Sequence, residues 1–132
     1  MSIRLPVAVV WLAWLLTVPT SAHHSFAAEF DANLPISLTG VVTKIEWSNP
    51  HVWFFIDVTD ESGAIANWGW EMGSPNGLMR QGWTRNSMAI GDVVSVEGSG
   101  AKDGGNRANA RVVLLSATGE RLFAASSQGQ AP

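Results

Sequence analysis

The 132-residue sequence contains no cysteine, and it has only 8 Lys and Arg residues against 11 Asp and Glu, a net charge of −3. The missing cysteine excludes a disulfide framework, cysteine-based zinc sites and thiol catalysis. Proteins that bind nucleic acid usually carry a basic patch, so we expect no nucleic-acid partner. The chain also lacks a Ser-His-Asp order, a phosphate-binding glycine loop and an HExxH motif. We therefore favour a binding protein over an enzyme.

The first 22 residues are predicted to be a secretory signal peptide. A short basic segment, Met1 to Arg4, precedes the apolar run Leu5 to Val18, which is short for a transmembrane span. Small residues follow and end at Ala22, as at signal peptidase sites. We predict cleavage after Ala22, a periplasmic or secreted protein, and no stable membrane insertion after cleavage. The alternative is an uncleaved membrane anchor.

Cleavage of 22 residues from 132 would leave 110 residues, enough for one domain. Loss of Arg4 would change the net charge from −3 to −4, and five of the seven Trp would remain. We expect one domain over residues 23–123, which starts with an extended arm from His23 to Pro35. A disordered tail, 124–132, is expected to follow it.

Hydrophobic alternation predicts an all-β fold with one short helix. Val52 to Thr59 gives the clearest strand, because every second residue is apolar over its length. Ser74-Pro75 is typical of a helix start, and Gly40 suggests a bend in the first strand. Five strands with a helix between the third and fourth favour a small OB-fold-like barrel; a small β-sandwich is the alternative. The expected strands are Ile36–Trp47, Val52–Thr59, Ala64–Met72, Val93–Gly98 and Ala108–Ala117.

The histidines suggest a metal site. Cleavage after Ala22 would make His23 the N-terminus, whose α-amine and ring Nδ1 can chelate one ion together. His51, at the start of a strand, would supply a third nitrogen, and His24 is a candidate fourth ligand. This arrangement is the histidine brace of copper proteins, and nitrogen ligands suit copper. The alternative is that His23-His24 lies in a solvated arm and His51 is an ordinary turn residue.

Five tryptophans in the mature chain leave a second hypothesis open. Trp53, Trp68 and Trp70 could line a face that binds a small ligand, a glycan or a partner protein. Packing within the fold is the alternative explanation, most strongly for Trp83. A more distant option is acid–base chemistry by Asp57 and Glu71, if the two carboxylates face each other across a hairpin.

Two segments carry a family resemblance. They are Ala22-His23-His24-Ser25-Phe26, and Trp47 to Trp53, which has the sequence WSNPHVW. With these motifs the chain resembles a family of small exported bacterial proteins known as a domain of unknown function. The resemblance implies export and a single β-rich domain, and it implies no activity.

These observations lead to one functional hypothesis. We predict copper carriage or buffering, as Cu(II) or Cu(I), through His23, His51 and His24. The expected partner is the metal ion, and a second periplasmic protein is left open as a further partner.

Overall fold

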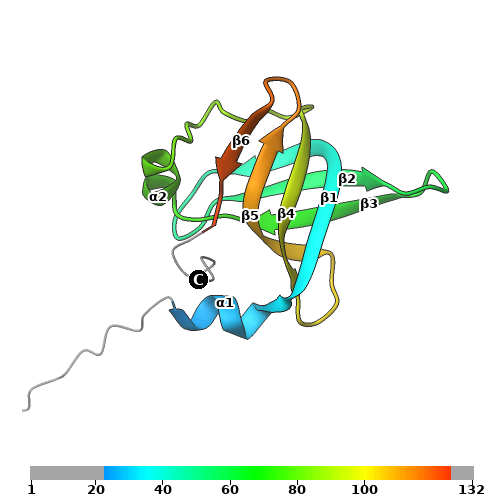
Figure 1. Ribbon diagram of the computed structural model, residues 1–132, viewed down its shortest axis with the longest axis horizontal. Coiled ribbons are helices and arrows are strands. Elements are labelled where there is room, and N and C mark those ends of the chain that lie inside the picture. The colour runs from blue at the N-terminus through cyan, green and yellow to red at the C-terminus, as the bar shows by residue number, and fades with distance from the viewer. Residues whose placement is uncertain (1–22, 126–132) are drawn as a thin grey trace, which may run out of the picture.

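The computed structural model describes residues 23–125. The predicted signal peptide and most of the predicted tail lie outside this range. Within it, no helix is long and apolar enough to cross a membrane. The elements, in chain order, are α1 (His23–Glu29), β1 (Phe30–Glu46), β2 (Trp53–Thr59), β3 (Ile65–Glu71), α2 (Pro75–Arg80), β4 (Val93–Ala101), β5 (Arg107–Leu115) and β6 (Glu120–Phe123) (Figure 1).

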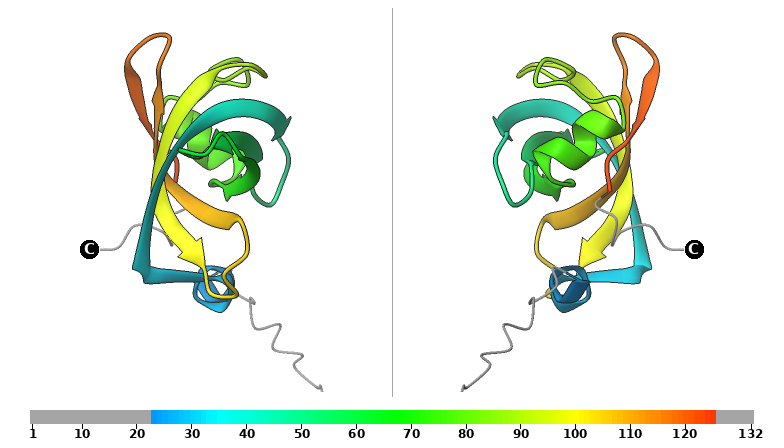
Figure 2. Two further views of the ribbon diagram at one scale, coloured as in Figure 1. Left: turned by 90° about the vertical axis from the view of Figure 1, so that its right-hand side faces the viewer. Right: turned by 90° about the vertical axis from the view of Figure 1, so that its left-hand side faces the viewer.

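Five of the strands form a closed ring. β1 pairs with β2 and with β4, β2 pairs with β3, and β4 pairs with β5, all antiparallel. A parallel pairing between β3 and β5 closes the ring, and Figure 2 shows the strands curling around a common centre. This mostly β arrangement, with α2 between β3 and β4, confirms the predicted β class and is compatible with both the OB-like barrel and the β-sandwich. β6 extends the sheet from β5 and was not predicted.

The predicted extended arm is wrong over its first half, because residues 23–29 form α1. A helix of seven residues is too short to show a clear period and needs tertiary contacts to be stable. Those contacts are present at its C-terminal end. The backbone N–H of Lys102 donates to the carbonyl of Glu29 over 2.9 Å, and the Phe26 and Phe30 rings lie 5.8 Å apart. Phe30 is fully buried and begins β1.

β1 is long because it pairs with two different strands along its length. Its first part pairs with β4, and its last part, from Val41, pairs with β2. Gly40 lies where the two pairings meet, and a Cβ there would come within 2.4 Å of the Asp57 carbonyl oxygen. The glycine is therefore required by a close backbone approach. The irregularity in the β1–β2 ladder falls slightly later, between Val42 and Lys44.

The inside of the ring is the hydrophobic core. Alternate residues of β2 point into it, and the rings of Phe54 and Trp70 stack there, 6.5 Å apart. α2 begins as predicted: the Ser74 hydroxyl accepts a hydrogen bond from the Gly77 N–H, and Pro75 occupies the first turn. Trp83 is buried behind this helix, and its Nε1 donates to the carbonyl of Phe123 over 2.9 Å.

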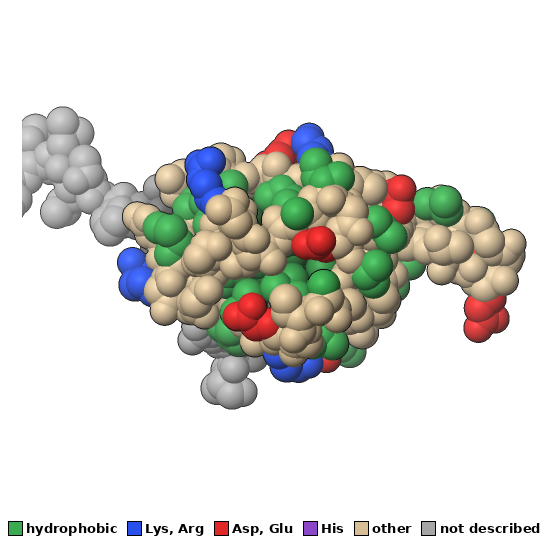
Figure 3. All heavy atoms as spheres, turned by 90° about the horizontal axis from the view of Figure 1, so that it is seen from above, with side chains coloured by type: hydrophobic (Ala, Val, Ile, Leu, Met, Phe, Trp, Pro, Cys, Tyr) green, Lys and Arg blue, Asp and Glu red, His purple; other side chains and the backbone are tan. Residues whose placement is uncertain are grey.

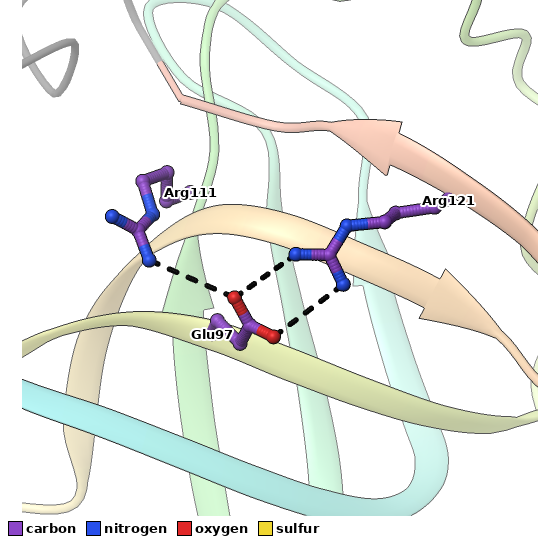
Figure 4. A network of polar contacts seen from close by, with 3 residues as sticks. All are labelled: Glu97, Arg111 and Arg121. Carbon is purple, nitrogen blue, oxygen red and sulfur yellow. Dashed lines mark hydrogen bonds and ion pairs between the residues drawn. The ribbon is translucent and has the colours of Figure 1, made fainter.

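Outside the ring, charged side chains are scattered. Figure 3 shows one such face, where acidic and basic side chains are spread among apolar and polar atoms, some of them next to one of opposite charge. The largest ion-pair cluster among the described residues joins Glu97 to Arg121, over 3.1 Å, and to Arg111, over 3.6 Å (Figure 4). All three side chains are well exposed. Such surface pairs contribute about 0–1 kcal/mol each.

Candidate functional site

The β2–β3 hairpin fixes which residues share the outer face of the ring. Its turn is held by a carboxylate, because Asp60 accepts hydrogen bonds from the Ser62 hydroxyl and from the Ala64 N–H. These bonds hold the pKa of Asp60 below its ordinary value. With this turn, Trp53 lies opposite Glu71 on the outer face, because their neighbours Phe54 and Trp70 face the core.

Glu71 is held by two polar side chains. The Nδ1 atom of His51 donates to its Oε1 over 2.8 Å. The Asn109 side-chain amide donates to the same oxygen over 3.5 Å, since the parallel β3–β5 pairing sets Asn109 beside Glu71. The His51 and Glu71 side chains are only 16% and 10% exposed. The result is a histidine–carboxylate pair whose two side chains are largely buried.

The hydrogen bond to Glu71 decides which nitrogen of His51 is available for other chemistry. A neutral imidazole has one N–H donor and one nitrogen with a free lone pair. Because Nδ1 donates to the carboxylate, Nε2 is the nitrogen that can accept a proton or bind a metal ion. Histidines that bind metals usually donate their other N–H in this way, which fixes the tautomer and the ring orientation.

The electrostatics around Glu71 are unusual for a surface strand. Burial raises the pKa of the Glu71 carboxyl above its ordinary value of 4.5. His51 opposes this rise, and the nearby carboxylate of Glu29 adds to it. The site therefore brings the end of α1, the end of β3 and the loop before β2 within electrostatic reach of one another.

A cavity of about 530 Å³ adjoins the pair. Its walls come from the end of α1, the loop between β1 and β2, and three strands. The volume lies in the range of small-molecule sites. The lining residues are Glu29, residues 48–51, Trp53, Glu71 and Arg107.

Of the predicted metal ligands, the structure describes the side chain of His51 alone. His23 and His24 contribute the first backbone turn of α1, but their side chains lie outside the described part of the chain. Among the side chains that are described, no group of three His, Cys, Asp or Glu residues could hold a metal ion. Glu71 and Asn109 were not predicted to accompany His51.

The three tryptophans predicted as one ligand face are not brought together. Trp70 is fully buried in the core, and Trp68, two residues earlier on the same side of β3, packs against that core. Trp53 lies on the opposite face and borders the cavity. The packing explanation is therefore correct for Trp70, and also for Trp83, which is 2% exposed.

The more distant option, acid–base chemistry by Asp57 and Glu71, is ruled out because the two residues do not face each other. In the hairpin register Asp57 lies opposite Asn67, and Asn67 donates to its carboxylate over 2.8 Å. Asn67 and Glu71 are four residues apart on β3, which corresponds to about 13 Å along a strand. Two carboxylates at that distance cannot act on one glycosidic bond.

The comparison with known protein families agrees with the resemblance stated above. A family model described as "Family of unknown function (DUF6152)" matches residues 12–110. The chain belongs to this family. No curated protein matches the DUF6152 chain. The matched range includes His51 and Glu71 of the candidate site.

Proposed function

We propose that this DUF6152 protein is exported and binds copper through an N-terminal histidine brace, to carry or buffer the metal. The ligands would be the α-amine and ring of His23 after cleavage at Ala22, together with Nε2 of His51. His24 is a candidate fourth ligand. Amine and imidazole nitrogens in a tetragonal arrangement suit Cu(II).

The observation that carries the proposal is the 2.8 Å contact between His51 Nδ1 and Glu71. It gives His51 the carboxylate partner that metal-binding histidines usually have, and it leaves Nε2 as the ligand atom. Asn109 holds the carboxylate from the other side. A ligand fixed in this manner, two residues before the start of β2, loses little entropy when it binds an ion.

The position of α1 is the second support. The helix runs from His23 to Glu29, and Glu29 lines the same cavity as His51. Six residues of helix span about 9 Å. Lys102 holds the end of α1, because its backbone N–H donates to Glu29 and its Nζ donates to the carbonyl of Ala27. A new N-terminus on this helix would thus start from a fixed base close to the cavity.

The test is an isothermal titration of Cu(II) into protein purified from the periplasm, with His23 confirmed as the first residue by intact mass. We expect one tightly bound ion, and loss of that binding in His51→Ala. Ser48→Ala, in the same loop, is the matched control and should bind as the wild type does. A protein with one extra residue before His23 should also lose the tight site, because its amine is displaced.

The affinity should fall as the pH is lowered from about 7 to about 5, because the amine and imidazoles must lose protons before they bind metal. Correctly processed protein that binds no copper, or binds it equally well after His51→Ala, would contradict the proposal.

A further inference from the structure

The outer face of β2 carries two aromatic rings that the core does not use. Trp53 and Phe55 are two residues apart and point to the same side. Their rings are 6.4 Å apart between centroids, with planes inclined by only 23°. Both side chains are half-buried, unlike Phe54 between them, which is fully buried. The two rings therefore form a nearly continuous, partly exposed surface.

Gly69 explains why these rings lie close to the sheet. It is the residue opposite Phe55 on β3. A Cβ at Gly69 would lie 3.0 Å from Phe55 Cε1 and 3.6 Å from Trp53 Cζ3. The bare backbone of this glycine is thus covered by both rings, which have one side against the sheet. We call Trp53, Phe55 and the underlying Gly69 the aromatic strip.

Polar groups lie at both ends of the aromatic strip. At one end, Asn67 donates to Asp57 over 2.8 Å and to the Thr43 hydroxyl over 3.1 Å. At the other end Trp53 borders the 530 Å³ cavity, whose lining includes the exposed polar residues Ser48 and Asn49. A flat apolar floor with hydrogen-bonding groups around it suits a ligand that has apolar ring faces and polar edges.

We propose that the aromatic strip binds a neutral saccharide chain, with sugar rings stacked on Trp53 and Phe55 and one end of the chain in the cavity. Sugar rings present C–H groups on their faces and hydroxyls on their edges, which matches the floor and the polar ends. In OB-like folds the face formed by the second and third strands is a frequent site for oligosaccharides and oligonucleotides. The proposal requires no metal at His51.

Charge favours a saccharide over a nucleic acid. The cations beside the strip and the cavity have carboxylate partners: Lys44, whose Nζ lies over the Phe55 ring, 5.2 Å from its centroid, pairs with Glu46. Arg107 pairs with Asp103 over 3.0 Å. Glu29 and Glu71 add negative charge in the cavity. Oligonucleotides need cationic contacts to their phosphates, whereas a neutral sugar chain does not.

The experiment is a calorimetric titration with cellohexaose, chitohexaose and oligo(dT) as probes. We expect at least one of the two saccharides to bind and oligo(dT) not to bind. Trp53→Ala and Phe55→Ala should each weaken saccharide binding by about tenfold or more. Gly69→Ala should also weaken it, because the added Cβ displaces the rings. Ile65→Ala, on the same face at the far end of β3 and 65% exposed, is the control that should change nothing.

The same variants separate this proposal from the copper site. Phe55→Ala should weaken saccharide binding and leave copper binding as in the wild type, since Phe55 does not line the cavity. The protein with one extra residue before His23 should do the reverse. A lack of binding by both saccharides would overturn the proposal. So would saccharide binding that survives both aromatic substitutions in folded protein, or tighter binding of oligo(dT).

Discussion

One strand, β2, contributes to two aromatic stacks on opposite faces of the ring. Inside, Phe54 stacks on Trp70 at 6.5 Å and 10°, and both are fully buried. Outside, Trp53 stacks on Phe55 at 6.4 Å and 23°, and both are half-buried. The two pairs are similar in composition and geometry. What differs is their surroundings, which are apolar core on one face and a cavity with polar groups on the other.

The neighbours of an aromatic pair, more than its residue types, indicate its role. On the inner face both strands supply bulky side chains, so the stack contributes to stability. On the outer face β3 supplies Gly69 and Glu71 instead. A glycine in a strand has no side chain to pack, and a carboxylate is costly to bury unless it is paired. They are consistent with a face that is used for binding.

A substitution that breaks the inner stack should cause the largest loss of folding stability. Trp70→Ala should destabilise the protein by about 3–5 kcal/mol, because it leaves a cavity in the core. Trp53→Ala should cost less, about 0.5–1.5 kcal/mol, the value of an aromatic pair. Urea unfolding monitored by circular dichroism measures both. Equal losses in the two variants would show that the outer rings are structural and remove the contrast between the faces.

The next largest effect is a loss of copper affinity when the polar part of the outer face is changed. Glu71→Gln keeps an oxygen that can accept the hydrogen bond from His51 but removes the carboxylate charge. Changes to such partners of metal ligands usually reduce metal affinity by about 10–100-fold. We expect a loss of this size in copper affinity, with the fold intact. The exposed Glu120→Gln is a matched control. Unchanged copper affinity in Glu71→Gln would show that Glu71 does not support a metal ligand.

A smaller effect should follow from loosening α1. Lys102→Met removes the hydrogen bond from Nζ to Ala27 but keeps the backbone bond to Glu29. One hydrogen bond is worth about 0.5–1.5 kcal/mol, so copper affinity should fall by a few-fold and amide exchange in α1 should quicken. Lys44→Met makes the same chemical change near the end of β1 that is farther from α1 along the chain. If exchange quickens while copper affinity stays constant, α1 does not position the metal site.

The smallest effect is expected at the hairpin turn, which sets the register of both faces. The pKa of Asp60 is lowered from 3.8, chiefly by the Ser62 hydroxyl and the Ala64 N–H. Its stabilising contribution is therefore present above the ordinary pKa and is lost as the pH falls through the lowered one. Asp60→Ala should lower the melting temperature slightly at neutral pH, and the difference from the wild type should shrink as the pH falls below the ordinary value of 3.8. A difference that grows in acid would contradict this assignment.

Much of the fold follows from local patterns. Val52 to Thr59 alternates, and the structure has a strand over Trp53–Thr59. Ser74-Pro75 starts a helix as expected. The elements that were not predicted as such, α1 and β6, are seven and four residues long. Segments of this length show no clear period, and they form here because other parts of the chain pair with them.

The site was less predictable, because its parts meet only through strand pairing. His51 was a candidate from its position at the start of a strand. Alternation alone allows Glu71 to lie opposite Asp57, because the register of the hairpin depends on the geometry of its turn. Asn109 gave no signal, because its place beside Glu71 depends on the parallel β3–β5 pairing. Alternation along β2 did place Trp53 and Phe55 together on the outer face.

We propose that Nε2 of His51, oriented by Glu71, binds copper together with the N-terminal histidine. The most direct measurement is the EPR spectrum of correctly processed protein loaded with one equivalent of Cu(II), with and without ¹⁵N labelling of histidine. We predict a tetragonal spectrum whose nitrogen couplings change with the label, and the loss of one coupled nitrogen in His51→Ala. A spectrum with oxygen ligands alone, or one that His51→Ala leaves unchanged, would contradict the claim.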